Sequence, residues 1–246
     1  MIKAVIFDLD GVIVTTDNCH YNAWKRMADE EGIYFDQKIN NRLRGVSRME
    51  SLEIILELSK KTYSDTEKVE LAERKNGYYV ELINKLTPDA ILPGVMDNLK
   101  ELKANGVKIA IGSSSKNTPL ILKRIGLENY FDVVSDGNNI SKSKPDPEVF
   151  LKAAEMLGIP PEDCMIVEDA DAGITAGRRA GMQTLAVGAA EGGDFKAESL
   201  NSVRLIELTD KFIAPKTVEY VCGKKIKIVE DGPHAYFDNG EMHVKD

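Results

Sequence analysis

Short apolar runs alternate along most of the chain with amphipathic stretches, and this alternation restricts the fold more than any other feature of the sequence. The first run, residues 4–7, reads Ala-Val-Ile-Phe and is followed at once by Asp8, Leu9 and Asp10. Runs this short cannot form helices, and their β-branched and aromatic residues favour buried strands. Further runs of this kind occupy residues 107–111, 131–134, 164–167 and 184–187.

The stretches between these runs have helical spacing, and each is followed by a glycine, which commonly ends a helix. They occupy residues 95–104, 119–125, 147–157 and 174–180. Strands that alternate with helices form a parallel sheet with helices on both faces. The sequence therefore predicts the α/β class, with a Rossmann-like parallel-sheet core.

Residues 17–87 interrupt this alternation with helical periodicity alone, for example at Tyr79, Leu82, Ile83 and Leu86. They predict an all-helical cap inserted after the first strand, so that residues 1–16 and 88–214 form the core. The junctions near residues 15 and 88 are rich in turn-forming residues and are expected to act as hinges.

Residues 215–246 differ again, because the alternating segment at 225–229 is followed by the turn signals Asp231-Gly232-Pro233 and Asn239-Gly240. This pattern predicts a C-terminal β-hairpin-like extension.

The net charge and the cysteines limit the classes of partner and the cellular compartment that we expect. The chain of 246 residues has 32 Lys and Arg against 40 Asp and Glu, a net charge of −8, so we expect no nucleic-acid partner. Three widely separated cysteines, Cys19, Cys164 and Cys222, favour a reducing cytoplasm over a disulfide framework. Charged residues interrupt the N-terminal apolar run, so we expect cytoplasmic localisation and no membrane partner.

Two pairs of acidic residues end predicted strands. Asp8 and Asp10 follow the first strand, and Glu168 and Asp169 follow the strand at 164–167. Parallel sheets bind ligands at the carboxyl ends of their strands, and four clustered carboxylates repel one another unless a hard cation such as Mg²⁺ neutralises them. We expect a magnesium site formed by Asp8, Asp10, Glu168 and Asp169. A simple turn or helix cap is the alternative for each pair taken alone.

Two loops offer phosphate donors. Residues 112–117 (Gly-Ser-Ser-Ser-Lys-Asn) follow a predicted strand with hydroxyls and a lysine, and Lys144 precedes a predicted helix. Either group could hold a phosphoryl oxygen. Taken singly, such segments are more often an ordinary loop and a surface lysine.

The order of these motifs resembles that of the haloacid dehalogenase superfamily, and the helical insertion resembles its four-helix-bundle cap. The resemblance implies an aspartyl-phosphate enzyme that uses magnesium. It implies these roles: Asp8 as nucleophile, Asp10 as general acid and base, Ser113 and Lys144 as phosphoryl ligands, and Glu168 and Asp169 as Mg²⁺ ligands.

Residues 2–187 resemble the β-phosphoglucomutase family more specifically, through the strings at 43–51, 73–76, 113–117 and 143–145. The resemblance implies that Arg48 binds the distal phosphate of a sugar bisphosphate. It implies substrate-binding positions at Ser115, Lys116 and Asn117 for that phosphate, at Gly45, Val46, Ser51 and Lys75 for the sugar, and at Thr16, His20 and Trp24 at the hinge and cap base. Two residues depart from the family pattern: Thr15 stands where an aspartate is usual, and Arg44 stands where a lysine is common.

The expected activity is that of an isomerase in carbohydrate metabolism. It would interconvert β-D-glucose 1-phosphate and glucose 6-phosphate through an aspartyl-phosphate, with glucose 1,6-bisphosphate as intermediate and activator, and the chain would act as a monomer. The alternatives are a Mg²⁺-dependent sugar-phosphate phosphatase, a mutase of another sugar phosphate, and a non-catalytic binding protein on the same scaffold. The intact set of core acids argues against the last.

Overall fold

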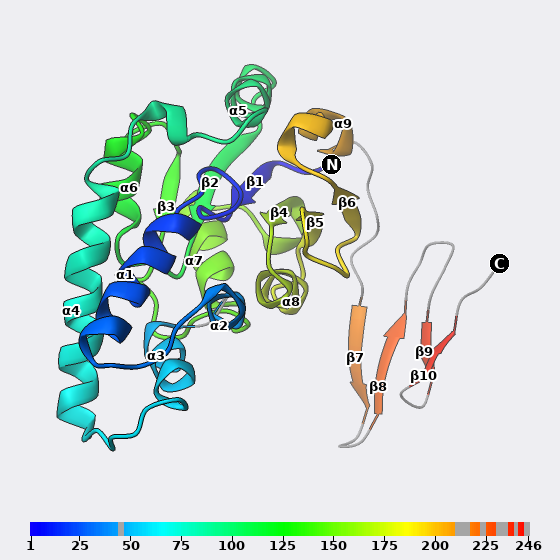
Figure 1. The fold of residues 1–246 in the computed structure, drawn as a ribbon. Helices are drawn as coiled ribbons and strands as arrows, with labels where there is room; N and C mark the ends of the chain where they lie inside the picture. The colour runs from blue at the N-terminus through cyan, green and yellow to red at the C-terminus, as the bar shows by residue number, and fades with distance from the viewer. Residues whose placement is uncertain (44–46, 210–216, 222–224, 230–235, 239–240, 244–246) are drawn as a thin grey trace.

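A parallel sheet forms the centre of the structure, a computed structural model that describes residues 1–43, 47–209, 217–221, 225–229, 236–238 and 241–243. Its six strands have the order β3-β2-β1-β4-β5-β6 (Figure 1). They are β1 (Ala4–Phe7), β2 (Lys108–Gly112), β3 (Val133–Ser135), β4 (Cys164–Glu168), β5 (Gln183–Val187) and β6 (Phe195–Ala197). All neighbouring strands pair in parallel. The predicted Rossmann-like α/β class is confirmed.

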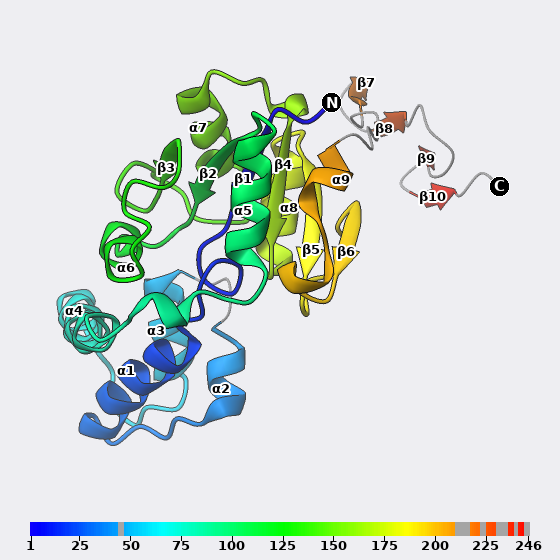
Figure 2. The ribbon, with the colours of Figure 1, turned by 90° about the horizontal axis from the view of Figure 1, so that it is seen from above.

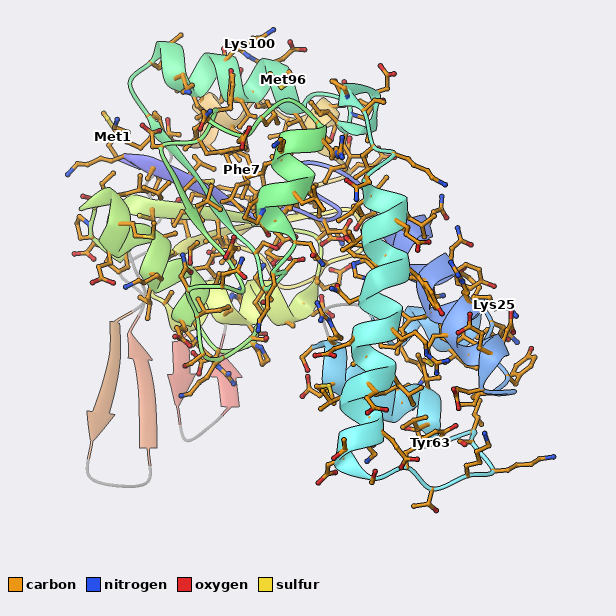
Figure 3. All side chains as sticks on the ribbon, turned by 90° about the vertical axis from the view of Figure 1, so that its left-hand side faces the viewer. Met1, Phe7, Lys25, Tyr63, Met96 and Lys100 are labelled. Carbon is orange, nitrogen blue, oxygen red and sulfur yellow. The ribbon has the colours of Figure 1, made fainter. Side chains whose placement is uncertain are left out.

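Two apolar clusters cover the two faces of this sheet. Successive side chains of a strand point to opposite faces, and accordingly Val5 and Phe7 belong to one cluster while Ala4 and Ile6 belong to the other. Figure 3 shows Phe7 among the interior side chains of the core. The first face is covered by α5 (Val95–Ala104), α6 (Thr118–Arg124) and α9 (Leu205–Thr209), and the second by α7 (Glu148–Leu157) and α8 (Asp171–Arg179).

Some elements differ from those predicted. The α8 helix begins at Asp171, three residues before the predicted start, because its first turn contains no large apolar side chain to mark it. The β6 strand and the α9 helix were not predicted, since β6 is a three-residue edge strand whose side chains are half-buried or exposed. Three short 3₁₀ helices complete the core: η1 (Pro88–Ala90), η2 (Pro161–Asp163) and η3 (Leu200–Ser202).

The described part of the cap contains four helices, grouped beside the core in Figures 1 and 2. They are α1 (Asp17–Glu30), α2 (Gln37–Asn41), α3 (Arg48–Leu56) and α4 (Asp65–Ile83). Their buried faces share a separate apolar cluster that includes Trp24, Met27 and Leu52. The α3 helix begins with a capping box, in which Ser47 and Glu50 satisfy each other's backbone N–H groups. The capping box fixes Arg48 as the first residue of α3.

The two chain segments that join cap and core lie against each other. Val14 forms an antiparallel bridge with Ile91, and the Leu92 N–H donates to the Ile13 carbonyl oxygen at 2.9 Å. Because both crossings are held together, backbone rotation there would move the cap as a unit, as expected of a hinge.

The C-terminal segment contains more strands than predicted. A single hairpin-like unit was expected in residues 215–246. Instead β7 (Thr217–Val221), β8 (Lys225–Val229), β9 (Tyr236–Asp238) and β10 (Glu241–His243) form one antiparallel sheet in chain order. Within the described residues, no helix has the length and apolar character needed to cross a membrane.

Two helical glycines predict opposite effects of the same substitution on stability. A Cβ at Gly177 of α8 would lie 2.5 Å from Cγ1 of buried Ile166, whereas a Cβ at Gly77 of α4 would meet nothing within 4 Å. We expect Gly177→Ala to lower the free energy of unfolding by about 1–3 kcal/mol through overpacking. Gly77→Ala should raise it by about 0.5–1 kcal/mol, because alanine favours the helix. Urea unfolding of both variants checks this, and a stabilised Gly177→Ala would contradict the close packing of α8 on β4.

Candidate active site

A cleft of about 770 Å³ lies between the cap and the carboxyl ends of the core strands. The core side is formed by residues that directly follow or end strands: Asp8 after β1, Ser113 after β2 and Glu168 at the end of β4. The cap side is formed by α1, α3 and α4, which contribute His20, Arg48 and Lys75 among others.

A buried lysine connects the two acidic pairs. The Lys144 Nζ donates hydrogen bonds to Asp8 Oδ1 and to Glu168 Oε1, and its side chain is 8% exposed. Burial alone would lower the pKa of Lys144, but the charges and hydrogen bonds of the two carboxylates outweigh burial and raise it. The lysine therefore stays protonated at neutral pH and offsets part of the negative charge around it.

Three of the carboxylates that were predicted to bind metal lie together. Asp8, Glu168 and Asp169 can each place one oxygen so that the three atoms lie within 4.8 Å of one another. Burial, followed by the charges of Asp8 and Glu168, raises the pKa of Asp169 to about 8. This repulsion, and the all-oxygen donor set, suit a hard divalent cation such as Mg²⁺.

Close packing sets the position of Glu168. A Cβ on Gly173 of α8 would lie 1.9 Å from the Glu168 carboxyl carbon, so only glycine leaves room for this side chain. Its Oε2 also accepts a hydrogen bond from the Ala170 N–H at 3.1 Å.

The side chain of Asp10 has different partners from those of the other three acids. Its two oxygens accept hydrogen bonds from the N–H and the hydroxyl of Thr16, the N–H at 2.6 Å. Although 31% of the side chain is open to the cleft, burial by the surrounding protein raises the pKa of Asp10 to about 6, against the lowering effect of Thr16. A carboxyl group with this pKa can both give and take a proton near neutral pH. Thr15, the departure from the family pattern, is exposed, and Thr16 holds the acid.

A second chain of contacts leads from Asp10 into the cap. The Nε2 atom of His20 lies 3.8 Å from Asp10 Oδ2, and its Nδ1 lies 2.9 Å from Lys75 Nζ. Burial and the charge of Lys75 lower the pKa of His20 well below 6.5, so the neutral ring accepts from Lys75 at Nδ1 and directs its N–H toward Asp10. The rings of Trp24 and Tyr79 enclose the Lys75 ammonium, at 4.6 and 4.8 Å from it.

A third group spans the mouth of the cleft between cap and core. Arg48 donates to the Asn76 side-chain oxygen at 2.9 Å, and Asn117 donates to the same oxygen at 3.0 Å. Ser115 and Lys116 lie beside Asn117 on the core side of the cleft. This group supplies several N–H donors to the same cleft as the Asp8 carboxylate.

Most predicted site residues therefore meet in one cleft. Thr16 donates a hydrogen bond to Asp10, which lines the cleft, and Ser51 lines the cleft from α3. Gly45 and Val46 lie outside the described residues. Sequence reasoning missed Tyr79 and Asn76 as site residues. Tyr79 was assigned only to a helix face, yet its hydroxyl donates to Thr16 Oγ1 at 2.9 Å. Asn76 was quoted only as part of a motif, beside Lys75.

The comparisons with known proteins agree with this arrangement. A family model described as haloacid dehalogenase-like hydrolase matches residues 2–181. A β-phosphoglucomutase from Bacillus subtilis is 48% identical over 188 residues, which cover 76% of this chain and 83% of the relative. A phosphorylated carbohydrates phosphatase from Thermotoga maritima is 32% identical over 74% of this chain and 83% of its own length. The crystal structure of a β-phosphoglucomutase from Clostridium difficile is 41% identical, with a TM-score of 0.79, covering 86% of this chain and 97% of that structure.

The buried Lys75 predicts a pH dependence of stability. Burial, followed by the charge of Arg48, lowers the pKa of Lys75 to about 7, whereas an unfolded lysine titrates near its ordinary value of about 10.4. Between these values the unfolded chain holds a proton that the folded chain lacks, so stability rises with pH. Lys75→Met should therefore be more stable relative to the original protein at pH 6.5 than at pH 9.5, by urea unfolding. The matched control is Lys85→Met at an exposed lysine, and a difference for Lys75→Met that does not change with pH would contradict the lowered pKa.

The carboxylate cluster predicts stabilisation by magnesium. A ligand that binds only the folded state at 100 times its Kd adds about 2.7 kcal/mol to the free energy of unfolding, so millimolar Mg²⁺ should raise the Tm. Asp169→Asn should lose most of that rise, because it removes one charged oxygen ligand. Asp171→Asn, two residues further and outside the cluster, is the control. Equal Tm shifts in all three proteins would show that Mg²⁺ binds elsewhere.

Proposed function

The chain belongs to the haloacid dehalogenase-like hydrolase family, and from that premise we propose that it is an isomerase of the β-phosphoglucomutase type. It interconverts β-D-glucose 1-phosphate and glucose 6-phosphate through an aspartyl-phosphate and a glucose 1,6-bisphosphate intermediate. The 48% identity to the Bacillus subtilis β-phosphoglucomutase and the close structural match to the Clostridium difficile enzyme support this assignment.

The observation that carries the proposal is the presence of two separate groups of phosphate donors in one cleft. Lys144 and Ser113 lie at the core end beside Asp8, and Arg48 lies on the cap beside Asn117. Among the described residues, no acidic side chain forms an ion pair with Arg48, although the charge of Glu73 acts on it from farther away. The guanidinium can therefore still bind an anion in the cleft. A phosphatase of small esters needs only the first group, whereas a bisphosphate intermediate needs both.

Asp8 is the nucleophile in the proposed reaction. One of its oxygens forms a bond to phosphorus as the bond from phosphorus to the sugar oxygen breaks, and Lys144 balances charge on the transferring oxygens. Asp10 gives its proton to the leaving sugar oxygen and later takes one from the sugar hydroxyl that attacks the aspartyl-phosphate. Asp8, Glu168 and Asp169 would hold Mg²⁺, which when bound offsets the negative charge of the phosphoryl group.

Cap movement has two roles in this scheme. The bisphosphate must turn end for end between the two transfers, which requires the cleft to open. Closure at the paired segments around Val14 and Ile91 would then exclude water from the aspartyl-phosphate. The proposal includes glucose 1,6-bisphosphate as activator and a cytoplasmic monomer as the working form. The free thiols of Cys19 and Cys164 are consistent with a reducing compartment.

A phosphatase remains the second candidate function. The Thermotoga maritima relative carries the name of a phosphorylated carbohydrates phosphatase, and a fructose-1-phosphate phosphatase of Escherichia coli is 31% identical over 74% of this chain. The same core acids serve both reactions, so the cap residues Arg48 and Lys75 must distinguish them. A mutase of another sugar phosphate would share these residues.

A coupled assay tests the proposal. With β-glucose 1-phosphate, Mg²⁺ and a trace of glucose 1,6-bisphosphate, glucose 6-phosphate should form much faster than free phosphate. Asp8→Asn should abolish both, because the nucleophile is lost. Arg48→Ala should reduce mutase turnover by about 10²-fold or more, the loss of a charge-assisted phosphate contact of about 3 kcal/mol, and reduce hydrolysis of small phosphate esters far less. Phosphate release without glucose 6-phosphate would favour the phosphatase.

A further inference from the structure

A single side-chain oxygen accepts hydrogen bonds from both sides of the cleft. The Oδ1 of Asn76, on α4 of the cap, accepts from Arg48 Nη2 at 2.9 Å and from Asn117 Nδ2 at 3.0 Å. Arg48 begins α3 of the cap, and Asn117 is the residue just before α6 of the core. Asn76 thereby joins three helices from two structural units at one atom.

The location of Asn76 favours a role in closing the cleft. The α4 and α6 helices lie side by side in Figures 1 and 2, and they are also joined by Arg124 Nε, which donates to Asn84 Oδ1 at 3.0 Å. Asn84 lies at the C-terminal end of α4 and does not line the cleft, whereas Asn76 does. The interface therefore has two similar bridges, only one of which touches the site.

The chemistry of the amide matters as much as its position. Arg48 is half-buried, and burial lowers its pKa, so a charged partner would bind it strongly. An aspartate here would form a charge-assisted pair and neutralise the guanidinium. The neutral amide oxygen orients one N–H of Arg48 without adding a negative charge next to the guanidinium, on which the charge of Glu73 already acts. The same oxygen orients one amide N–H of Asn117, which leaves the second N–H of that amide free to donate to a ligand.

We propose that Asn76 is a positioning residue for the distal phosphate: its amide oxygen orients Arg48 and Asn117 toward the cleft, and its neutrality preserves the positive charge that attracts the phosphate. This inference rests on the proposed function, because it requires a substrate with a second phosphate. It assigns to Asn76 no contact with the reacting atoms at Asp8.

Asn76→Asp keeps the size of the side chain and adds a charge, so it tests the inference directly. The KM for glucose 1,6-bisphosphate should rise at least about tenfold, equivalent to 1.4 kcal/mol, because the new carboxylate pairs with Arg48 and repels phosphate. The KM for p-nitrophenyl phosphate, which lacks a second phosphate, should rise much less in the same protein. Asn84→Asp is the matched control, because it makes the same change on the same helix next to an arginine and should change neither KM.

A second variant separates positioning from folding. In an Arg48→Ala background, adding Asn76→Asp should raise the KM for the bisphosphate by less than it does alone, because the two residues act through one contact. Equal KM rises with both substrates, or additive effects in the double variant, would overturn the inference while leaving the mutase assignment intact. An original protein that forms no glucose 6-phosphate would overturn both.

Discussion

The arrangement of the active site depends on one electrostatic constraint. Several mutually repelling carboxylates lie close together where β1 and β4 end. Asp8, Glu168 and Asp169 meet there because parallel strands bring their carboxyl ends to the same edge of the sheet. Lys144 offsets part of this charge from a buried position between Asp8 and Glu168. Burial, followed by the charges of Asp8 and Glu168, raises the pKa of Asp169 to about 8, and one lysine faces three carboxylates. The remaining negative charge is what makes the site suitable for a divalent cation, and through that cation for a phosphoryl group.

In the proposed reaction the cap supplies a second anion site and encloses the cleft, neither of which the sheet edge provides alone. A phosphoryl group at Asp8 can be attacked by water or by a sugar hydroxyl, and only an enclosed cleft with a second anion site favours the sugar. In the proposed reaction Arg48 provides that site, and Asn76, which accepts a hydrogen bond from Arg48, sets its direction from a neighbouring helix. Thr16, the last core residue before the cap, holds Asp10 and contacts Tyr79 of α4. Hydrogen bonds through Thr16 thus connect Asp10, the proton donor of the proposed reaction, with α4 of the cap.

The sequence predicts the elements whose signals are local and misses contacts that depend on folding. The strands β1, β2, β4 and β5 were placed to within one residue, because each contains a short run of apolar residues. The β6 strand was missed, since Phe195–Ala197 has no such run. The candidate residues Asp8, Ser113, Glu168 and Asp169 could be named because they end or follow predicted strands. Lys144 could be named only through its place in the order of motifs. Asn76 could not be singled out, because its partner Asn117 lies 41 residues away and only the packing of α4 beside α6 brings them together. Tyr79 was hidden for a similar reason, since its hydroxyl bonds to a residue 63 positions earlier.

The central claim is that the phosphoryl group on Asp8 passes to a sugar and not to water. The most direct measurement starts from protein carrying a ³²P-labelled aspartyl-phosphate, mixed with excess glucose 6-phosphate and quenched within a single turnover. The account predicts that most of the label appears in glucose 1,6-bisphosphate and that little appears as inorganic phosphate. Label released mainly as inorganic phosphate, at a rate that glucose 6-phosphate does not change, would contradict it and identify the protein as a phosphatase.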